Sequence, residues 1–459
     1  MQIVVIGAGV TGLCAARRLL LSESISDKSV IVVEKSCPPA GLMQTTRRGD
    51  YWWDDGAYLF WSYSALVSIV PEIFEVVENY AEKKYVDGAF REFPIDRQDI
   101  MPLLSPGRFA HALVSYGYHL LRRCLKPTAP HLHAWCQDRL TPMGFEESHL
   151  ETFFVKLMGC GSKELSPLFG EARFSFIDEM TKPKQVARLI FKHIKRQSED
   201  AGNLHPCYPR GIGAGAINSA IVNQVRELGG QVRYNMPVKQ IHDLEDDGVE
   251  IHCRHNNTDT DEIIRADYVI STIPIDILAH IKRPSVSPTC LKISESLEYR
   301  ILLLIFFIVD RSVIISDIAT VYTCEKHHIW HRLVSQSLGG GKSSIVVETT
   351  FSPTDAVDTQ SILEDVEKNI IDELKLFKSD EIVARDHKYV EYAYPVLSLG
   401  YEHKVSRIIK EVESRRVRTA GKQGKFRYWG TSNCVKDASD VADNIIADIA
   451  HARRNRNFP

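Results

Sequence analysis

Short runs of apolar residues that suit buried strands alternate with amphipathic segments along the chain. Near the start, residues 2–7 and 30–35 are rich in β-branched side chains, as is typical of strands buried in a parallel sheet. The segment between them places Leu13, Ala16 and Leu20 on one face of a helix. This succession predicts a strand, a helix and a second strand within the first 35 residues.

Two later stretches have different periodicities. Residues 96–204 have mainly helical periods, whereas residues 291–384 begin with strand-like runs and end in a helix. We expect these strands at 297–310, 318–325, 328–337 and 343–351, and the helix at 361–377. The glycine-rich residues 339–342 predict a hairpin turn. The longest apolar run, at 301–309, is too short to cross a bilayer as a helix and therefore predicts a buried strand.

A glycine motif lies at the turn between the first strand and the helix. Gly7, Gly9 and Gly12 form the pattern Gly-x-Gly-x-x-Gly, and Glu34 follows at the end of the second strand. Such glycines allow a tight turn, a close approach of backbone to a pyrophosphate, and close packing of the helix on the strand. The helix N-terminus attracts phosphates, and the carboxylate can accept hydrogen bonds from ribose hydroxyls. The combination predicts a dinucleotide site rather than a structural turn.

Composition narrows the class of protein. The 459 residues favour two or more domains, and the formal net charge of -3 gives no overall attraction to nucleic acid. The ten cysteines are scattered without a C-x-x-C pair, which indicates reduced thiols rather than a disulfide framework or a zinc site. Met1 leads directly into an apolar strand without a basic segment or a cleavage site. We therefore expect no signal peptide, no integral membrane segment and a cytoplasmic location.

Segments from the beginning, middle and end of the chain resemble those of one flavoprotein superfamily. The loop EKSCPPAGLMQTTRRGDYWWDDGAYLFW, which starts at Glu34, is similar to that of amine oxidases, protoporphyrinogen oxidases and UDP-galactopyranose mutases. YPRGIGAGAINS from Tyr208 and RTAGKQGKFRYWGTSN from Arg418 resemble the middle and terminal units of the same superfamily. The resemblance implies an α/β fold in which a Rossmann-like FAD-binding domain, discontinuous in sequence, accompanies a mixed α+β substrate domain.

The resemblance implies a division of the chain into five parts. Residues 1–95, 205–290 and 385–459 would form the FAD-binding domain. Residues 96–204 would form a helical region near the substrate, and residues 291–384 a β-rich substrate domain. Substrate sites often form between domains, and the same location is expected here. The expected partner is a small-molecule substrate.

The resemblance also implies which residues hold FAD. In the superfamily the first glycine loop binds the pyrophosphate, the loop after the acid runs beside the flavin, and the last helix points its N-terminus at the flavin. That N-terminus would stabilise negative charge on the reduced ring. The residues expected to bind the cofactor are Gly7, Gly9, Gly12, Glu34, Lys35, Gly41, Leu42, Val238, Gly421, Thr431 and Ser432.

The sequence departs from the superfamily pattern at three places. Ala40 replaces a glycine before Gly41, which requires a negative φ at Ala40. Tyr58 stands where a histidine is usual near the flavin, and a phenol can donate a hydrogen bond but is a poor base at neutral pH. Thr431-Ser432 replaces a Met-Asp pair, and serine suits the N-cap of the last helix.

Arginines are the candidate substrate contacts. Arg300 and Arg332 resemble strand arginines that help mutase-like members to hold a sugar-nucleotide diphosphate, and Arg427 resembles an arginine after the terminal glycine. The planar guanidinium suits phosphate and carboxylate oxygens, although a salt bridge or a solvated strand edge is the alternative for each. The candidate catalytic residues are Tyr58, Arg332 and Arg427.

Three functions remain open from sequence. The favoured one is an FAD-dependent oxidoreductase, an oxidase or dehydrogenase that moves a hydride from a small organic substrate to the flavin in a biosynthetic pathway. The first alternative is a mutase-like flavoenzyme that acts on a nucleotide sugar without net redox change, and the second is a non-catalytic binder of the same fold. His327, His328 and His331 share no carboxylate or thiol pattern, so we expect no metal site.

Overall fold

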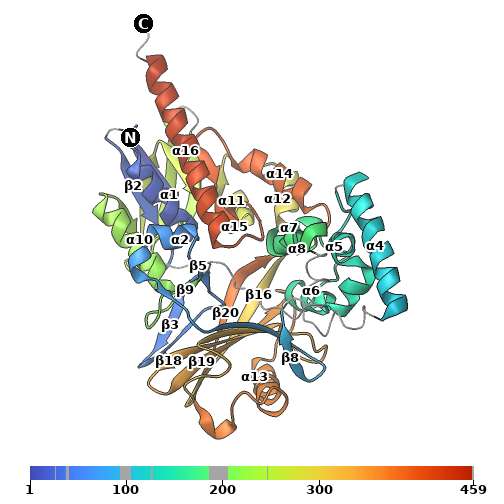
Figure 1. Ribbon diagram of the computed structural model, residues 1–459. Helices are drawn as coiled ribbons and strands as arrows, with labels where there is room; N and C mark the ends of the chain where they lie inside the picture. Colours follow the sequence, from blue (N-terminus) through green and yellow to red (C-terminus); the bar gives the residue numbers. More distant parts are fainter. Residues whose placement is uncertain are drawn as a thin grey trace. The chain divides into compact units, whose positions relative to one another are not determined.

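The computed structural model describes residues 1–25, 27–37, 41–93, 105–125, 128–185, 205–244 and 247–456. The chain divides into two units, each assembled from separate stretches of sequence (Figure 1). Unit 1 comprises Met1–Val76, Cys207–Glu298 and Tyr401–Pro459. Unit 2 comprises Val77–Pro206 and Tyr299–Gly400.

A parallel sheet forms the centre of unit 1. Its five strands have the order β10-β2-β1-β14-β21, and every neighbouring pair is parallel. The central strand, β1, is apolar and buried over most of its length, as expected of a strand covered on both faces. Helix α1 follows β1 and packs against both α10 and α16 (Figure 1). This arrangement confirms the predicted Rossmann-like α/β fold.

The remaining strands of unit 1 form a four-stranded sheet with the order β13-β12-β11-β15, the hairpin β3-β4, and a three-stranded sheet with the order β5-β9-β6. The strands associated with unit 1 are β1 (Gln2–Ile6), β2 (Ser29–Val33), β3 (Thr45–Arg48), β4 (Tyr51–Asp54), β5 (Phe60–Trp61), β6 (Glu75–Val76), β9 (Pro206–Tyr208), β10 (Gln231–Arg233), β11 (Val238–Asp243), β12 (Val249–His255), β13 (Thr260–Ala266), β14 (Tyr268–Ser271), β15 (Lys282–Arg283) and β21 (Val417–Thr419). The helices are α1 (Val10–Leu21), α2 (Ala65–Ile69), η1 (Pro71–Ile73), α10 (Gly215–Glu227), α11 (Ile275–Ile281), α12 (Pro288–Glu295), α14 (Tyr401–Val412), α15 (Gly421–Gly424) and α16 (Thr431–Arg456).

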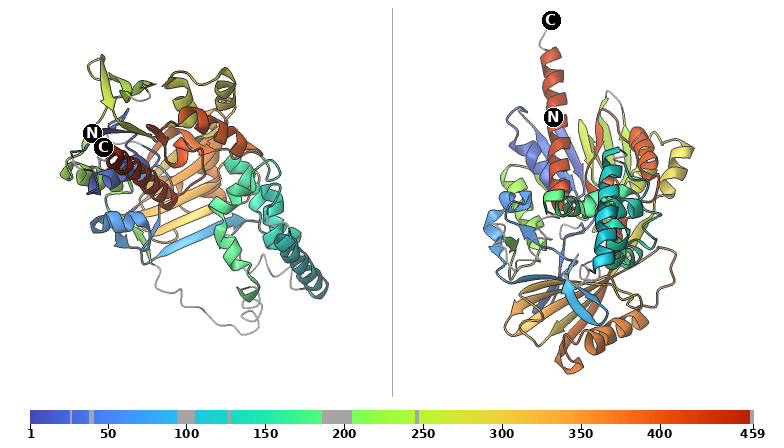
Figure 2. Two further views of the ribbon diagram at one scale, coloured as in Figure 1. Left: turned by 90° about the horizontal axis from the view of Figure 1, so that it is seen from above. Right: turned by 45° about the vertical axis from the view of Figure 1, so that its right-hand side comes forward.

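A seven-stranded sheet with the order β20-β16-β19-β18-β17-β7-β8 forms unit 2. Neighbouring strands are antiparallel except for β17 and β7. Figure 2 shows helices α4 to α8 of this unit grouped together. The strands are β7 (Tyr80–Val86), β8 (Ala89–Glu92), β16 (Tyr299–Val309), β17 (Ile318–Thr323), β18 (Arg332–Gly339), β19 (Lys342–Phe351) and β20 (Ile382–Pro395). The helices are α4 (Pro106–Leu125), α5 (Leu132–Glu147), α6 (Leu150–Met158), α7 (Pro167–Arg173), α8 (Ser175–Met180), α13 (Thr359–Lys368), η4 (Asn369–Glu373) and η5 (Ser379–Glu381).

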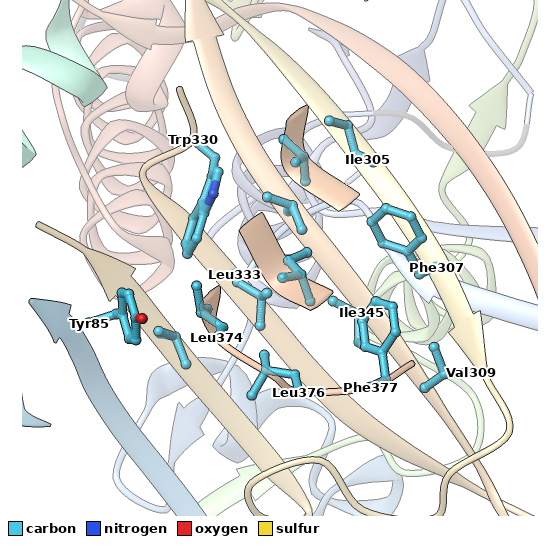
Figure 3. Packing of buried hydrophobic residues seen from close by; sticks show 14 of the residues in the cluster. Tyr85, Ile305, Phe307, Val309, Trp330, Leu333, Ile345, Leu374, Leu376 and Phe377 are labelled. Carbon is cyan, nitrogen blue, oxygen red and sulfur yellow. The ribbon is translucent and has the colours of Figure 1, made fainter. Parts of the chain in front are cut away.

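The hydrophobic core of unit 2 lies between this sheet and the segment from α13 to Phe377 (Figure 3). Alternate residues of β16, including Ile305 and Phe307, point toward the apolar face of α13, which contributes Ile362 and Val366. The long apolar run at 301–309 is therefore a buried strand, as the sequence predicts. Among the described residues, no helix is both long enough and apolar enough to cross a membrane.

Two predicted elements in unit 2 have different limits in the structure. Strand β18 begins at Arg332, so the prediction of a strand from residue 328 is wrong at its start. The helix predicted at 361–377 ends as an α-helix at Lys368 and continues as the π-helix η4. Before β18, His328 Nδ1 lies 2.7 Å from the Thr323 hydroxyl. At the start of η4, the side-chain oxygen of Asn369 accepts the Trp330 indole N–H at 3.3 Å. The hairpin predicted at the glycines joins β18 to β19.

Candidate flavin-binding site

The first glycine loop in unit 1 has no room for side chains at two positions. Gly7 has a φ of +102° and donates its N–H to the Val33 carbonyl at 2.8 Å. A Cβ on Gly12 would lie 1.9 Å from the Gly7 carbonyl oxygen. Gly9 immediately precedes α1 and has no side chain that could cap the first turn. The N–H groups of that turn are the kind that bind phosphate oxygens.

Glu34 lies directly after β2 and is buried against the glycine loop. Its Oε2 accepts the Ala8 N–H at 2.8 Å, and its Oε1 accepts the Ser36 N–H at 3.1 Å and the Ser36 hydroxyl at 2.8 Å. These bonds fix the carboxylate beside the loop, and each oxygen has more than one lone pair to offer. The next residue, Lys35, is exposed, and its carbonyl accepts a hydrogen bond from Asn256 at 3.3 Å.

A second backbone segment lies against the first glycine loop. Gly41 has a φ of +123°, and a Cβ there would lie 3.1 Å from the Gly9 Cα. The carbonyl of Leu42 accepts a hydrogen bond from the Tyr58 hydroxyl. The Tyr58 hydroxyl, predicted from sequence to be a catalytic group, therefore bonds to the backbone of this segment. The negative φ expected at Ala40 lies outside the described residues.

The segment that leads into β11 meets the second strand of the parallel sheet. The Met236 N–H donates to the Glu34 carbonyl at 2.9 Å. Val238, two residues later, is the first residue of β11 and pairs with Cys253 of β12. Val238, one of the predicted cofactor contacts, thus lies two residues after Met236, which is bonded to the predicted ribose contact Glu34.

The terminal segment of unit 1 approaches the beginning of α1. Gly421 has a φ of +81°, and a Cβ there would lie 2.5 Å from the Thr11 hydroxyl. Its N–H donates to Asp437 at 2.8 Å. Helix α16 begins at Thr431, and the Cys434 N–H donates a backbone hydrogen bond to the Gly430 carbonyl. Ser432 therefore lies in the first turn of α16, and the prediction that it caps the helix is wrong.

A buried carboxylate, Asp54, joins separate segments of unit 1. It accepts hydrogen bonds from the Thr45 hydroxyl at 2.6 Å, from the Ala214 N–H at 2.9 Å and from the Tyr208 hydroxyl. Burial raises the pKa of Asp54 to about 6, although these three donors oppose the shift and the nearby Asp55 adds to it. Asp54 thereby links the β3-β4 hairpin to the segment before α10.

In unit 2, the candidate Arg332 is paired with a fully buried carboxylate. Its Nη2 lies 2.7 Å from Glu348 Oε1 and 2.6 Å from Oε2. The Tyr394 hydroxyl donates to Glu348 at 3.1 Å, and His331 Nε2 lies 3.5 Å from the same carboxylate. Burial alone would raise the pKa of Glu348, but the Arg332 charge and the His331 contact outweigh burial and lower it to about 2. Arg332 therefore forms a salt bridge, which sequence analysis gave as the alternative to a substrate contact.

The other two arginines also have protein partners. Arg300 donates to the Thr350 carbonyl at 3.0 Å, and its guanidinium occupies the space where a Cβ on Gly159 would lie. Arg427, in unit 1, donates to the Tyr401 hydroxyl at 3.0 Å.

Sequence comparison places the chain in a family. Residues 10–385 match the flavin containing amine oxidoreductases. The chain belongs to this family. Membership confirms the predicted superfamily and the prediction of a flavin, FAD, as cofactor. No curated protein matches the sequence significantly.

Solved structures with low sequence identity share the fold. A reduced UDP-galactopyranose mutase has 18% identity and a TM-score of 0.75, with 97% of this chain and 94% of that chain covered. A putative protoporphyrinogen oxidase from Exiguobacterium sp. 255-15 has 15% identity and a TM-score of 0.70, over 97% and 99% of the two chains. Cyclohexylamine oxidase from Brevibacterium oxydans IH-35A has 13% identity and a TM-score of 0.65, over 98% and 99%.

The residues of this family member fit a dinucleotide. A cofactor phosphate needs exposed N–H groups and close backbone, and Gly7, Gly9 and Gly12 supply a turn in which a side chain at Gly12 would collide with backbone. Sequence analysis missed Asp54 and Tyr208 as a pair. The Asp54-Asp55-Gly56 turn and the Tyr208 segment were both recognised, but no spacing rule connects residues 154 positions apart.

Proposed function

We propose that this protein is an FAD-dependent oxidoreductase that takes a hydride from a small, uncharged or singly charged organic substrate. Unit 1 would bind the cofactor. The first glycine loop would hold the pyrophosphate, Glu34 the ribose, and the backbone at Val238 the adenine. Gly41, Leu42, Gly421, Thr431 and Ser432 would line the flavin end, and Lys35 would contact the outer edge of the nucleotide.

Bound FAD supplies a two-electron acceptor, and the chain supplies binding, orientation and exclusion of water. The substrate would carry a C–H bond next to an N–H, O–H or C–H group, and its two-electron oxidation would form a double bond between those two atoms. The product would be an imine, a carbonyl compound or an alkene. The complete reaction would also consume oxygen or another two-electron acceptor.

The observation that carries this proposal is the pairing of Arg332 with Glu348. A mutase-like enzyme that holds a sugar-nucleotide diphosphate needs arginines whose charge is available to phosphate oxygens. Here both Glu348 oxygens lie within 2.7 Å of the Arg332 Nη2. A diphosphate at this arginine would also lie close to a carboxylate whose lowered pKa keeps it ionised. The pair favours a substrate without a diphosphate.

Anaerobic reduction of the purified holoenzyme tests the proposal. Primary amines, alicyclic amines and cyclic ketones would be mixed with the oxidised protein while flavin absorbance is recorded. Bleaching by at least one of these classes, followed by recovery in air or with an artificial acceptor, is the expected result. The Gly9→Val variant serves as the control, because a side chain at that position would fill the phosphate-binding turn and prevent FAD binding.

Titration with UDP separates the proposal from the mutase-like alternative. We expect no saturable change in flavin absorbance, in either the oxidised or the dithionite-reduced state, at millimolar UDP. Tight UDP binding that Arg332→Ala abolishes, together with isomerisation of a nucleotide sugar only by the reduced enzyme, would replace the proposed reaction with the mutase-like one. Lack of any flavin in freshly purified protein would favour the non-catalytic binder.

A further inference from the structure

Two histidines and a glutamate from distant parts of unit 2 meet at one point. His327 and His328 lie in the connection between β17 and β18, and Glu373 is the last residue of η4. The Nε2 atoms of His327 and His328 lie 2.9 and 3.1 Å from the same Glu373 oxygen, Oε2. All three ligand-type atoms lie within 4.8 Å of one another. A single ion with bonds of about 2 Å to nitrogen and oxygen could contact all three.

The buried histidine of this cluster is held in a fixed orientation. His328 has 1% of its surface exposed, and its Nδ1 lies 2.7 Å from the Thr323 hydroxyl. Its ring lies nearly parallel to those of Tyr85, at 6.0 Å and 13°, and Trp330, at 5.1 Å and 16°. A hydrogen bond to the second ring nitrogen is the usual way in which proteins orient a metal-binding histidine. His328 Nε2 is thereby directed at Glu373.

The carboxylate is oriented in a comparable way. Asn369 donates its amide to Glu373 Oε1 at 2.9 Å, which leaves Oε2 directed at the histidines. The Asn369 side-chain oxygen in turn accepts the Trp330 indole N–H at 3.3 Å. Asn369 and Glu373 are the first and last residues of a π-helix, a rare conformation that often occurs at functional sites.

One side of the cluster is open to solvent. The side chain of His327 is 59% exposed and that of Glu373 is 35% exposed, whereas that of His328 is fully buried. Three protein ligands with one open position is the arrangement of zinc sites that retain a water molecule. The charge of the half-buried Lys156 acts on His328; this amine donates to the Trp330 carbonyl at 3.2 Å, and burial lowers its pKa to about 7. A partly neutral amine opposes a bound cation less than a charged one does.

We propose that His327, His328 and Glu373 bind one Zn²⁺ ion per chain, with water completing a tetrahedral site. The ion would replace the two N–H donors that the Glu373 oxygen otherwise requires. The ion would link the β17–β18 connection to the end of η4, and both segments belong to unit 2. This site is independent of the flavin and of the proposed reaction. It reverses the expectation from sequence, in which no carboxylate accompanied these histidines.

Zinc titration of the holoenzyme tests the site. Chelator-treated protein, with FAD retained, would be titrated with ZnCl₂ by calorimetry and with CoCl₂ by absorbance above the flavin bands. We expect one equivalent of each metal to bind, with the intense visible bands of tetrahedral Co²⁺. His327→Ala and Glu373→Gln should each weaken binding by at least about tenfold, since even outer-shell partners contribute 10–100-fold.

The matched control is His280→Ala. His280 forms an exposed pair with Glu295, in which Nε2 and Oε1 lie 3.2 Å apart, but this pair has one histidine instead of two. His280→Ala should leave both titrations unchanged. Flavin absorbance and circular dichroism would verify folding of each variant, and His327→Gln provides a second substitution at an exposed position. The proposal is overturned if the holoenzyme shows no saturable binding, or if the His327 and Glu373 variants bind as the original protein does.

Discussion

The two units each bury a carboxylate, and the contrast between Asp54 in unit 1 and Glu348 in unit 2 shows how partners decide ionisation. Both side chains accept a tyrosine hydroxyl, from Tyr208 and Tyr394 respectively. Yet the pKa of Asp54 is raised by burial to about 6, whereas that of Glu348 is lowered to about 2 against the effect of burial. Burial and a phenol are common to both sites, so neither explains the difference.

The difference lies in charge. Glu348 faces the guanidinium of Arg332, whereas the donors recorded to Asp54 within the described part of the chain are uncharged. A neutral hydrogen bond favours the ionised form of a carboxylate only modestly, while a cation at contact distance in a buried place favours it strongly. Glu348 therefore stays ionised in its ion pair with Arg332, whereas Asp54 can gain or lose a proton near pH 6.

The largest expected effect follows from removing the charge of Glu348. Glu348→Gln leaves Arg332 buried without its counter-ion, which should lower the free energy of unfolding by about 3–5 kcal/mol. Urea unfolding at pH 7 with saturating FAD, followed by tryptophan fluorescence, measures the change. The double variant Arg332→Met/Glu348→Met removes both charges and should recover most of the loss. Equal stability of Glu348→Gln and the original protein would contradict the account of this pair.

The second prediction concerns pH dependence. The folded pKa of Asp54, about 6, lies above the value of about 3.9 expected in the unfolded chain. The folded protein therefore binds the proton more tightly, and this contribution to stability is complete below about pH 4 and lost as pH rises through 6. Its size is about 2–3 kcal/mol. Asp54→Asn should remove this dependence of the unfolding free energy on pH between pH 4 and 7. Glu348→Gln should leave the dependence in that range in place.

Thermal or urea unfolding across that pH range measures the slope. The exposed Asp50→Asn, in the same β3-β4 hairpin, is the control and should leave the slope unchanged. The contribution of Glu348 has the opposite sign, because its folded pKa is depressed. It is present above about pH 4.5 and is lost as pH falls toward 2. A slope retained in Asp54→Asn would assign the effect to another group.

The comparison also shows what the sequence could predict. The run from Gln2 to Glu34 specifies strand, glycine turn, helix and acid by local periodicity and spacing, and the structure forms the predicted Rossmann-like unit there. The ion pair of Arg332 and Glu348 depends on the register of β18 against β19, in which these two residues are direct partners. Register is fixed by tertiary packing, so the sequence could offer Arg332 only with a salt bridge as an alternative.

The failure at the start of β18 has the same physical origin. Residues 328–331 include Ile329 and Trp330, residue types that are enriched in strands. In the structure the His328 ring instead lies nearly parallel to the ring of Tyr85, on strand β7, and to that of Trp330 in the same connection. Periodicity describes which face is apolar, but it does not describe a partner contributed from 243 positions earlier in the chain. Sequence analysis missed the cluster of His327, His328 and Glu373 for the same reason, because Glu373 lies about 45 positions from the histidines.

The third prediction compares the tyrosines on the two carboxylates. Tyr208→Phe removes one of the uncharged donors to Asp54, so the free energy of unfolding should fall by about 1–2 kcal/mol at pH 7, where Asp54 is ionised. The loss should be smaller at pH 4.5, because a protonated carboxyl needs that donor less. Urea unfolding at the two pH values measures it. A loss of equal size at both would show that Tyr208 acts through packing rather than through the Asp54 charge.

The smallest effect is expected from the corresponding change in unit 2. Tyr394→Phe removes the hydroxyl that lies 3.1 Å from Glu348, but Arg332 continues to contact both carboxylate oxygens. The loss should be about 0.5–1 kcal/mol and should be the same at pH 7 and pH 4.5, because Glu348 is ionised at both. Tyr389→Phe, at an exposed position on the same strand β20, is the control for loss of a phenol. A larger, pH-dependent loss for Tyr394→Phe than for Tyr208→Phe would mean that the hydroxyl, and not the guanidinium, keeps Glu348 ionised.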